Sequence, residues 1–314
     1  MWVLIGLAVA GVALVTVSAD HLIIGAGRIA AQLRVAPAVV GVVVIGLGTS
    51  APGFLVAGVA AAEGDVELAA GSLIGSNIIG LTLILGVTAF VAPVVLRSSV
   101  VRHEALLAVS AVALFGVIAA WRLGPLAGLL LAVVAVGVVA MLMRLAREIP
   151  DRALPSEVAE FLEGGPRPKP VREGVRTALG LAGTFAGAQL LVDNAGELGV
   201  RMGVPQVVVG ATLVAVGTSL PQLVTCVQAQ RRGEGDLLVG NLLGCNLFNS
   251  LAGGAVVGFA ARSTRAVRID AGTVAAMVLV ALLAWALLFR GRRVGRGEGG
   301  VLLTAYLLTL PMLL

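Results

Sequence analysis

Two stretches of the sequence place glycine, proline and hydroxyl-bearing residues inside apolar segments. They read GLGTSAPGFLVAG over 46–58 and AVGTSLPQLVTCV over 215–227. Proline in a helix leaves a backbone carbonyl without its amide donor, and lipid tolerates such a group only where protein or a wet cavity satisfies it. Hydroxyl oxygens at the same level come from Thr49, Ser50, Thr218 and Ser219. Together these oxygens predict a site for a small cation, with helix breaks at Gly46, Gly48, Pro52, Gly217 and Pro221.

Each stretch is followed by a second motif that contains glycine and asparagine. The two copies read GSLIGSNIIGL over 71–81 and GNLLGCNLFNSL over 240–251. A purely structural reading of all four motifs is also open. In that reading Ser and Thr bond to the preceding turn of their own helix, and glycine allows close helix packing.

The elements that must position these residues are membrane helices. Of the 314 residues 59% are hydrophobic and only 12% are charged, and the mean hydropathy is +1.04. Soluble domains carry about 25% charged residues, so a water-soluble globule is excluded. Apolar runs of about 17 to 25 residues cross a bilayer as helices. We therefore expect an all-α polytopic membrane protein with spans at 2–33, 36–61, 68–94, 104–121, 124–143, 174–200, 204–229, 237–261, 269–289 and 299–314.

The distribution of basic residues predicts the orientation of these spans. The side that carries the polar segment 148–173 receives 17 of the 22 lysines and arginines. By the positive-inside rule this central loop is cytoplasmic, and both termini of this cell-membrane protein face outward. Basic residues that flank apolar runs are orientation signals, so we expect no nucleic-acid partner. The expected partners are the lipid bilayer and inorganic cations. The oligomeric state is left open.

An internal repeat organises the chain. Adding 169 to a residue number aligns Thr49-Ser50 with Thr218-Ser219, Pro52 with Pro221 and Asn77 with Asn246, without gaps. Each copy holds five expected spans, and five is odd, so the second copy enters from the opposite face as an inverted repeat. The expected units are a first repeat over 1–147 with its core at 36–86, and a second over 174–314 with its core at 205–255. Such repeats place their matching helix pairs at mid-membrane, where secondary transporters hold substrates.

These motifs resemble those of the sodium/calcium exchanger family of cation antiporters, whose two repeats carry G-T-S-x-P-E and G-S-N-x-x-[ND] elements. The resemblance implies ten helices and an ion site on the second, third, seventh and eighth. It also implies alternating access, in which the first and sixth helices slide against the other eight. Sodium is then a transported cation, with calcium, potassium or protons as further possibilities, and no cofactor is expected.

The sequence carries no carboxylate at the four central positions, and it departs from the family pattern at three of them. At the fourth, Asn249 fits the pattern, but Cys245 replaces the serine of that copy. Gly53 and Gln222 replace the glutamates of G-T-S-x-P-E, and Gly80 and Asn249 stand at the last position of the second element. Calcium takes six to eight oxygen ligands, several of them charged. We therefore predict that the fold is retained and that the calcium site is altered or lost. The candidate ion-path residues are Thr49, Ser50, Gly53, Ser76, Asn77, Thr218, Ser219, Gln222, Asn246 and Asn249.

Two acidic residues remain at expected membrane depth, Asp20 and Asp193, one on the first span and one on the sixth. Intramembrane carboxylates are costly and commonly couple ions or protons. Alternatively, each is an interfacial residue on a long tilted helix. Enzyme activity is not expected, because the serines lack a G-x-S-x-G elbow and the glycine pattern at 25–30 lacks βαβ context. The alternative function is that of a non-transporting, exchanger-like membrane scaffold or regulator.

Overall fold

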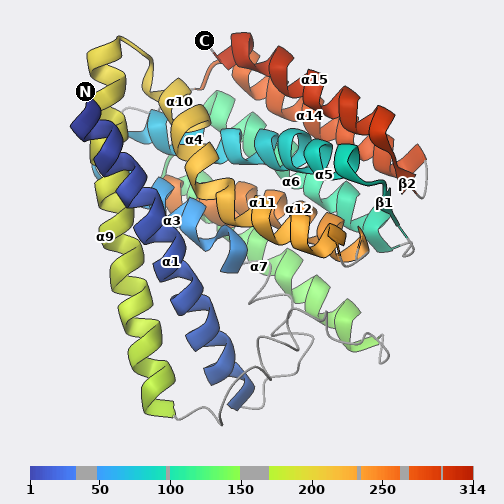
Figure 1. Ribbon diagram of the computed structural model, residues 1–314, viewed down its shortest axis with the longest axis horizontal. Helices are drawn as coiled ribbons and strands as arrows, with labels where there is room; N and C mark the ends of the chain where they lie inside the picture. The colour runs from blue at the N-terminus through green and yellow to red at the C-terminus, as the bar shows by residue number, and fades with distance from the viewer. Residues whose placement is uncertain are drawn as a thin grey trace.

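The computed structural model describes residues 1–32, 48–96, 100–148, 170–231, 235–261, 269–290 and 293–313 (Figure 1). Nearly all of these residues are helical. A short antiparallel ladder joins β1 (Val94–Val95) to β2 (Arg293–Val294) and pairs Val94 with Val294. The ladder links the two halves of the chain at one end of the molecule (Figure 1). Most of the predicted central loop, 148–173, lies outside the described residues.

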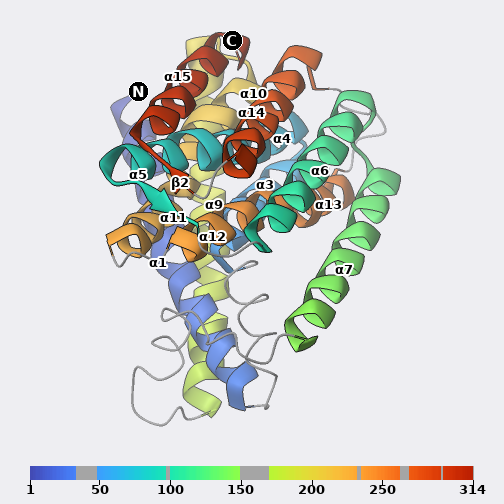
Figure 2. The same ribbon diagram turned by 90° about the vertical axis from the view of Figure 1, so that its right-hand side faces the viewer.

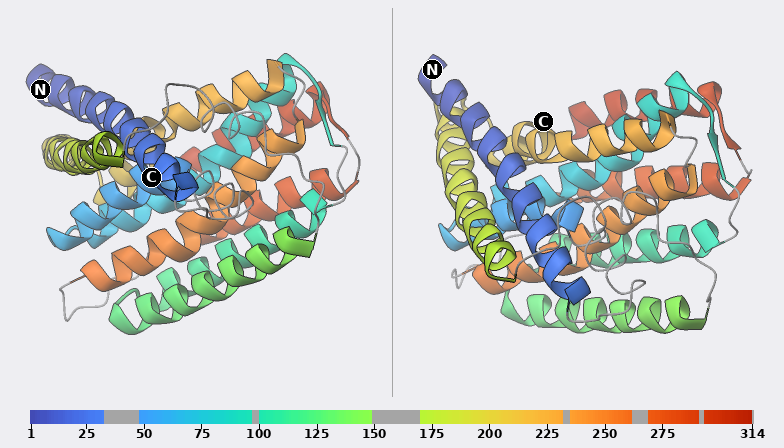
Figure 3. Two further views of the ribbon diagram at one scale, coloured as in Figure 1. Left: turned by 90° about the horizontal axis from the view of Figure 1, so that it is seen from below. Right: turned by 60° about the horizontal axis from the view of Figure 1, so that its bottom comes forward.

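Two long helices, α1 (Trp2–Gln32) and α9 (Pro170–Met202), lie side by side and cross the direction of most other helices (Figures 1 and 3). Small residues set their spacing. A Cβ added to Gly11 would lie 2.7 Å from the backbone nitrogen of Leu191, and one added to Gly187 would lie 2.7 Å from that of Val15. The two backbones are therefore in direct contact, as in membrane helix pairs built on small residues.

The remaining helices divide between the two halves of the chain. The first half contains α3 (Gly48–Ala62), α4 (Val66–Ile79), the π-helical turn η2 (Gly80–Ile84), α5 (Leu85–Val91), α6 (Val100–Trp121) and α7 (Pro125–Glu148). The second half contains α10 (Gln206–Val209), η3 (Gly210–Val214), α11 (Ala215–Arg231), α12 (Gly235–Phe248), η4 (Asn249–Gly253), α13 (Gly254–Ala260), α14 (Ala271–Arg290) and α15 (Arg296–Leu313). Adding 169 to the bounds of α4, η2 and α5 reproduces the bounds of α12, η4 and α13.

Within the described part of the chain, six helical segments are long and apolar enough to cross a bilayer. They are Trp2–Leu22, Val66–Val91, Pro125–Leu142, Pro170–Met202, Leu238–Ala260 and Ala271–Arg290. Shorter apolar helices at Pro52–Ala62, Ala105–Trp121 and Gln206–Leu220 fall within three further predicted spans. The all-helical membrane class predicted from composition is confirmed, and the full set of ten spans stays a prediction.

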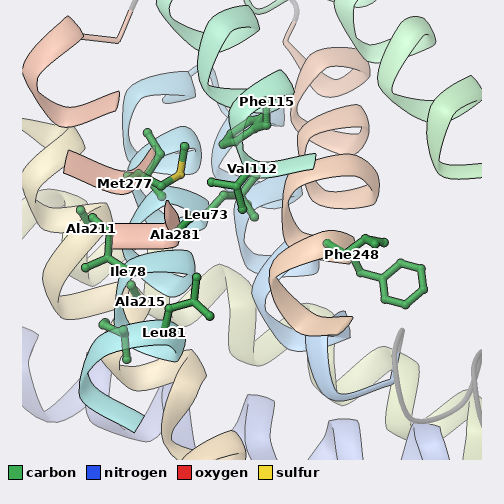
Figure 4. Close-up of a cluster of buried hydrophobic side chains, with 14 of the residues drawn as sticks. Leu73, Ile78, Leu81, Val112, Phe115, Ala211, Ala215, Phe248, Met277 and Ala281 are labelled. Carbon is green, nitrogen blue, oxygen red and sulfur yellow. The ribbon is translucent and has the colours of Figure 1, made fainter. Parts of the chain in front are cut away.

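Helices of the two halves pack against each other around a common core. α5 packs on α15, α6 on α14 and α7 on α13. Figure 2 shows α7 at the edge of the molecule, where its other sides are open. Its exposed side chains are large and apolar, as a lipid-facing helix requires. The buried core lies where α4 and η2 meet α6, α11 and α14, and it includes Leu73, Leu81, Phe115, Ala215 and Met277 (Figure 4).

Candidate ion-binding site

The site lies where the π-helical turns η2 and η4 meet the glycine- and proline-containing helices α3 and α11. η2 begins at Gly80 and η4 begins at Asn249, and these positions are related by the 169-residue offset. A π-helical turn widens the helix by one residue and is frequent at functional sites. Both turns continue an α-helix into a second α-helix, so the chain passes through the site without a break at these points.

The four central positions approach each other in two pairs, as the place of an added Cβ on each glycine shows. A Cβ added to Gly53, on α3, would lie 3.8 Å from Oδ1 of Asn249. A Cβ added to Gly80 would lie 3.8 Å from Nε2 of Gln222, on α11. The offset converts Gly53 into Gln222 and Asn249 into Gly80, so each contact is the counterpart of the other. The first half contributes glycine at both of its positions, and the second half contributes an amide at both.

Three asparagines, Asn77, Asn246 and Asn249, are all at least 95% buried. Nδ2 of Asn77 donates to Oγ of Ser250 at 2.9 Å and to Sδ of Met277 at 3.5 Å. Nδ2 of Asn246 donates to the carbonyl of Leu242 at 2.8 Å. Among the described residues, Oδ1 of all three asparagines has no hydrogen-bond partner.

Oγ of Ser50 is a fourth buried oxygen without a partner in the described part of the chain. A buried acceptor without a partner costs about 1–3 kcal/mol. A bound cation removes that cost, because amide and hydroxyl oxygens are ordinary ligands of hard cations. Neutral oxygens of this kind can hold a cation, and the amide nitrogens of Asn77 and Asn246 already donate hydrogen bonds within the protein.

The hydroxyl residues divide between the two readings of the sequence. Oγ1 of Thr218 donates to the carbonyls of Val214 at 3.0 Å and Ala215 at 3.3 Å, which is the bond to the preceding turn that the structural reading expects. Its lone pairs remain available for an ion. Ser76 and Ser219 are each 5% exposed. The side chain of Thr49 lies outside the described residues.

The helix breaks predicted at Pro52, Gly217 and Pro221 are wrong, and the one predicted at Gly48 stays a prediction because the residues before it lie outside the described part of the chain. Helix α3 starts at Gly48 and continues through Pro52, and α11 runs from Ala215 to Arg231 through positions 217 and 221. Proline removes only the amide that would bond four residues back, so the carbonyls of Gly48 and Gly217 lose a donor while the helix continues. The departure from α geometry before α11 lies at Gly210–Val214 instead. Gly46 lies outside the described residues.

The two acids predicted at membrane depth lie apart from these amides. Asp20 is exposed on α1, next to His21. Asp193 is exposed on α9, and its Oδ1 accepts a hydrogen bond from Nε2 of Gln189 at 3.1 Å. The same nitrogen bonds Oε1 of Glu63, in the turn that follows α3. Asp193 is therefore connected to the α3–α4 turn.

Two features of the described structure were not found by sequence analysis. One is Ser250, which orients Asn77; its counterpart under the offset is Leu81, so the repeat gives no signal for it. The other is a buried ion pair between the long helices. Glu173 of α9 is 2% exposed, and its carboxylate lies 3.3 Å from Nη1 of Arg28 and 3.8 Å from Nη1 of Arg176. The charge signs alone could have suggested this pair.

Comparisons with known proteins agree with this architecture. The profile of a family described as sodium/calcium exchanger protein matches residues 3–144 and 175–314. The chain is 34% identical to the inner membrane protein YrbG of Escherichia coli, with 98% of this chain and 95% of that protein aligned. It is 33% identical to a protein of Alkalimonas amylolytica named as an antiporter, CaxA, over 95% of this chain and 94% of that one.

Among solved structures, the sodium-calcium exchanger NCX_Mj, soaked with Na⁺ and Sr²⁺, superposes with a TM-score of 0.66. The two chains are 26% identical, and the superposition covers 99% of each. The similarity thus extends over the whole molecule and includes both halves with their motifs. The chain belongs to the sodium/calcium exchanger protein family.

Proposed function

We propose that this protein is a secondary active cation antiporter that works by alternating access and binds its cation at the central asparagines. The observation that carries the proposal is the set of unpartnered Oδ1 atoms on Asn77, Asn246 and Asn249, buried between the two halves of the chain. A cation is the ligand that satisfies several buried acceptors at once. The match to an exchanger family and the similarity to NCX_Mj support transport as the purpose of that binding.

The two halves form an inverted repeat in this proposal. The equal element bounds under the 169-residue offset support it, as do the paired contacts of Gly53 with Asn249 and of Gly80 with Gln222. Inverted repeats exchange conformations to open a central site to either side of the membrane. The closely packed α1 and α9 then move as one unit, because their backbones are in direct contact at Gly11 and Gly187.

The central site favours ions other than calcium. Its four central positions hold two glycines, a glutamine and an asparagine. A divalent ion 4 Å from a single carboxylate gains on the order of 8 kcal/mol at an effective dielectric constant near 20, before desolvation. A site without carboxylates loses this term, and a monovalent ion loses only half as much. Calcium binding is therefore weakened more than monovalent binding.

We also propose an orientation in the cell membrane. The central loop 148–173 is cytoplasmic and both termini face outward, as the distribution of basic residues predicts.

Asp20 and Asp193 are candidates for ion or proton coupling. Asp20→Asn is expected to change the pH dependence of transport, and an unchanged pH profile would remove Asp20 from this role.

Flux measurements in proteoliposomes test the function. We expect saturable cation exchange driven by an opposing cation gradient, with weak calcium transport. The double variant Gly53→Glu with Gln222→Glu restores two carboxylates and should gain calcium transport. Robust sodium-driven calcium uptake by the unmodified protein would contradict the altered selectivity. An absence of flux for sodium, potassium, calcium and protons in both proteins would favour the non-transporting scaffold.

A further inference from the structure

The two halves contribute unequally to the site. Gly53 and Gly80 of the first half present no side chain, whereas Gln222 and Asn249 of the second half are at least 94% buried and present amides. Within the described part of the chain, a Cβ at Gly53 would meet one atom within 4 Å, Oδ1 of Asn249 at 3.8 Å. Space therefore lies beside an unpartnered oxygen, on the first-half side of the site.

We propose that the central site selects a monovalent cation larger than sodium, of the size of potassium, and that Gly53 is its size-determining residue. This inference rests on the proposed function and names the substrate class of the same site. The missing side chain of Gly53 provides the room for the ion, and Oδ1 of Asn249 lies beside that room. Oδ1 of Asn77, Oδ1 of Asn246 and Oγ of Ser50 are the further neutral ligands in this proposal.

The weak ligand field of neutral oxygens favours the same ion as the room beside Gly53 does. Sodium and calcium have similar radii and bind water strongly, so a site must repay a large dehydration cost to hold either of them. Neutral amide and hydroxyl oxygens repay less than carboxylates do. Cavity size and ligand field strength are competing explanations of potassium selectivity in other proteins. At this site both favour the larger, more weakly hydrated ion.

The asparagines also resist closing around a smaller ion. Nδ2 of Asn77 is held by Ser250 on η4 and by Met277 on α14, and Nδ2 of Asn246 is held by a carbonyl of its own helix. Each of these bonds fixes the position of the amide oxygen on the same side chain. Contraction toward a sodium ion would stretch or break these buried bonds. A larger ion reaches the oxygens without this rearrangement.

The two glycines differ in the space around them, which makes them informative as variants. A Cβ at Gly53 meets Asn249 at an ordinary contact distance, so Gly53→Ala fills space without displacing a neighbour. A Cβ at Gly80 would lie 3.0 Å from Nδ2 of Asn246, so Gly80→Ala pushes on a ligand as well. Gly137 of α7 has no atom within 4 Å of its added Cβ, so Gly137→Ala is a matched control for the helix-stabilising effect of alanine.

The experiment measures binding and flux across a series of cation sizes. Thermal shifts of the purified protein are titrated with sodium, potassium and rubidium chloride at constant ionic strength, and rubidium uptake is followed in proteoliposomes. We expect potassium and rubidium to bind more tightly than sodium. Gly53→Ala should reduce the potassium-to-sodium preference about tenfold, the lower end of what one methyl group is worth in a closed pocket. Gly137→Ala should keep the original preference.

The remaining outcomes distinguish a failure of the size assignment from a failure of the proposed function on which it rests. Tighter binding of sodium than of potassium, or an unchanged preference in Gly53→Ala, would overturn the size assignment and leave antiport intact. If no cation shifts the melting temperature and none is transported, the proposed function fails as well. If Gly53→Ala does not fold, the wild-type titrations decide, with tighter binding of potassium than of sodium expected and the reverse order contradicting the proposal.

Discussion

Asn77 on α4 donates a 2.9 Å hydrogen bond from Nδ2 to Oγ of Ser250 on η4. The bond joins the first half of the chain to the second at the point where the cation site is proposed. It also fixes the side chain of Asn77 so that its Oδ1 is left as a buried, unpartnered acceptor in the described structure. The interaction therefore serves both the packing of the two halves and the binding of a cation.

Ser250→Ala should weaken cation binding. The change leaves Nδ2 of Asn77 with Met277 as its remaining partner, at a cost of about 1–3 kcal/mol for a buried donor. We expect a higher apparent Kd or KM for the transported cation and a smaller change in maximal flux. Thr88→Ala removes another buried hydroxyl, one that bonds carbonyls of its own helix, and serves as control. Equal cation affinity in wild type and Ser250→Ala would contradict the role given to this bond.

Gly180→Ala should disrupt the contact between α1 and α9. A Cβ at Gly180 would overlap the backbone of Leu22, which cannot move aside as a flexible side chain can. We expect a lower melting temperature and a strong loss of flux. Gly174→Ala on the same helix adds its Cβ where no atom of the described residues lies within 4 Å, and it should be neutral or slightly stabilising. The two variants behaving alike would show that this close approach is not needed.

Glu173→Gln should destabilise the pair of long helices. The Glu173 side chain is 3% exposed, whereas those of Arg28 and Arg176 are 16% and 27% exposed. Breaking a fully buried ion pair costs about 3–5 kcal/mol, so we expect a smaller but clear loss here, because water reaches both arginines. The exposed pair of Glu197 and Arg201 offers the control, because such pairs contribute about 0–1 kcal/mol. We expect thermal unfolding in detergent to show a clear loss for Glu173→Gln and almost none for Glu197→Gln. A smaller loss of thermal stability in Glu173→Gln than in Glu197→Gln would show that this ion pair does not stabilise the contact between the two helices.

Asp65 precedes α4 and caps its N-terminus, with Oδ1 accepting from the backbone N–H of Leu68 at 3.2 Å. Burial raises the pKa of Asp65 above 3.8, and the hydrogen bond from Leu68 offsets part of this rise. The folded state thus holds the proton more tightly than the unfolded state. Stability contributed by this group falls as pH increases from the unfolded pKa through the raised folded pKa.

Two substitutions at this position separate the cap from the charge. Asp65→Asn keeps a good N-cap and removes the buried charge, so its melting temperature at pH 7 should equal or exceed that of the wild type. The advantage should vanish as the pH falls below the folded pKa. Asp65→Ala loses the cap as well as the charge, so it should be about 1 kcal/mol less stable than Asp65→Asn at every pH. A wild type more stable than Asp65→Asn at pH 7 would contradict the inferred direction.

The class of the molecule and the identity of its central residues follow from the sequence alone. Scarce charge and long apolar runs dictate membrane helices, because a helix satisfies its own backbone groups in lipid. The 169-residue offset makes Asn77 and Asn246 equivalent positions of the repeat. These properties are encoded locally or by comparison of one segment with another, so they are visible in the chain alone.

Which of these residues face each other depends on the tertiary structure. That Gly53 faces Asn249, and that Gly80 faces Gln222, depends on how α3, α11 and the two π-helical turns cross. The continuity of α11 through Gly217 and Pro221 also required the structure, because tertiary packing compensates for a missing amide that local propensity treats as a break. The unpartnered oxygens that suggest a cation exist only once the surrounding helices have excluded water from them.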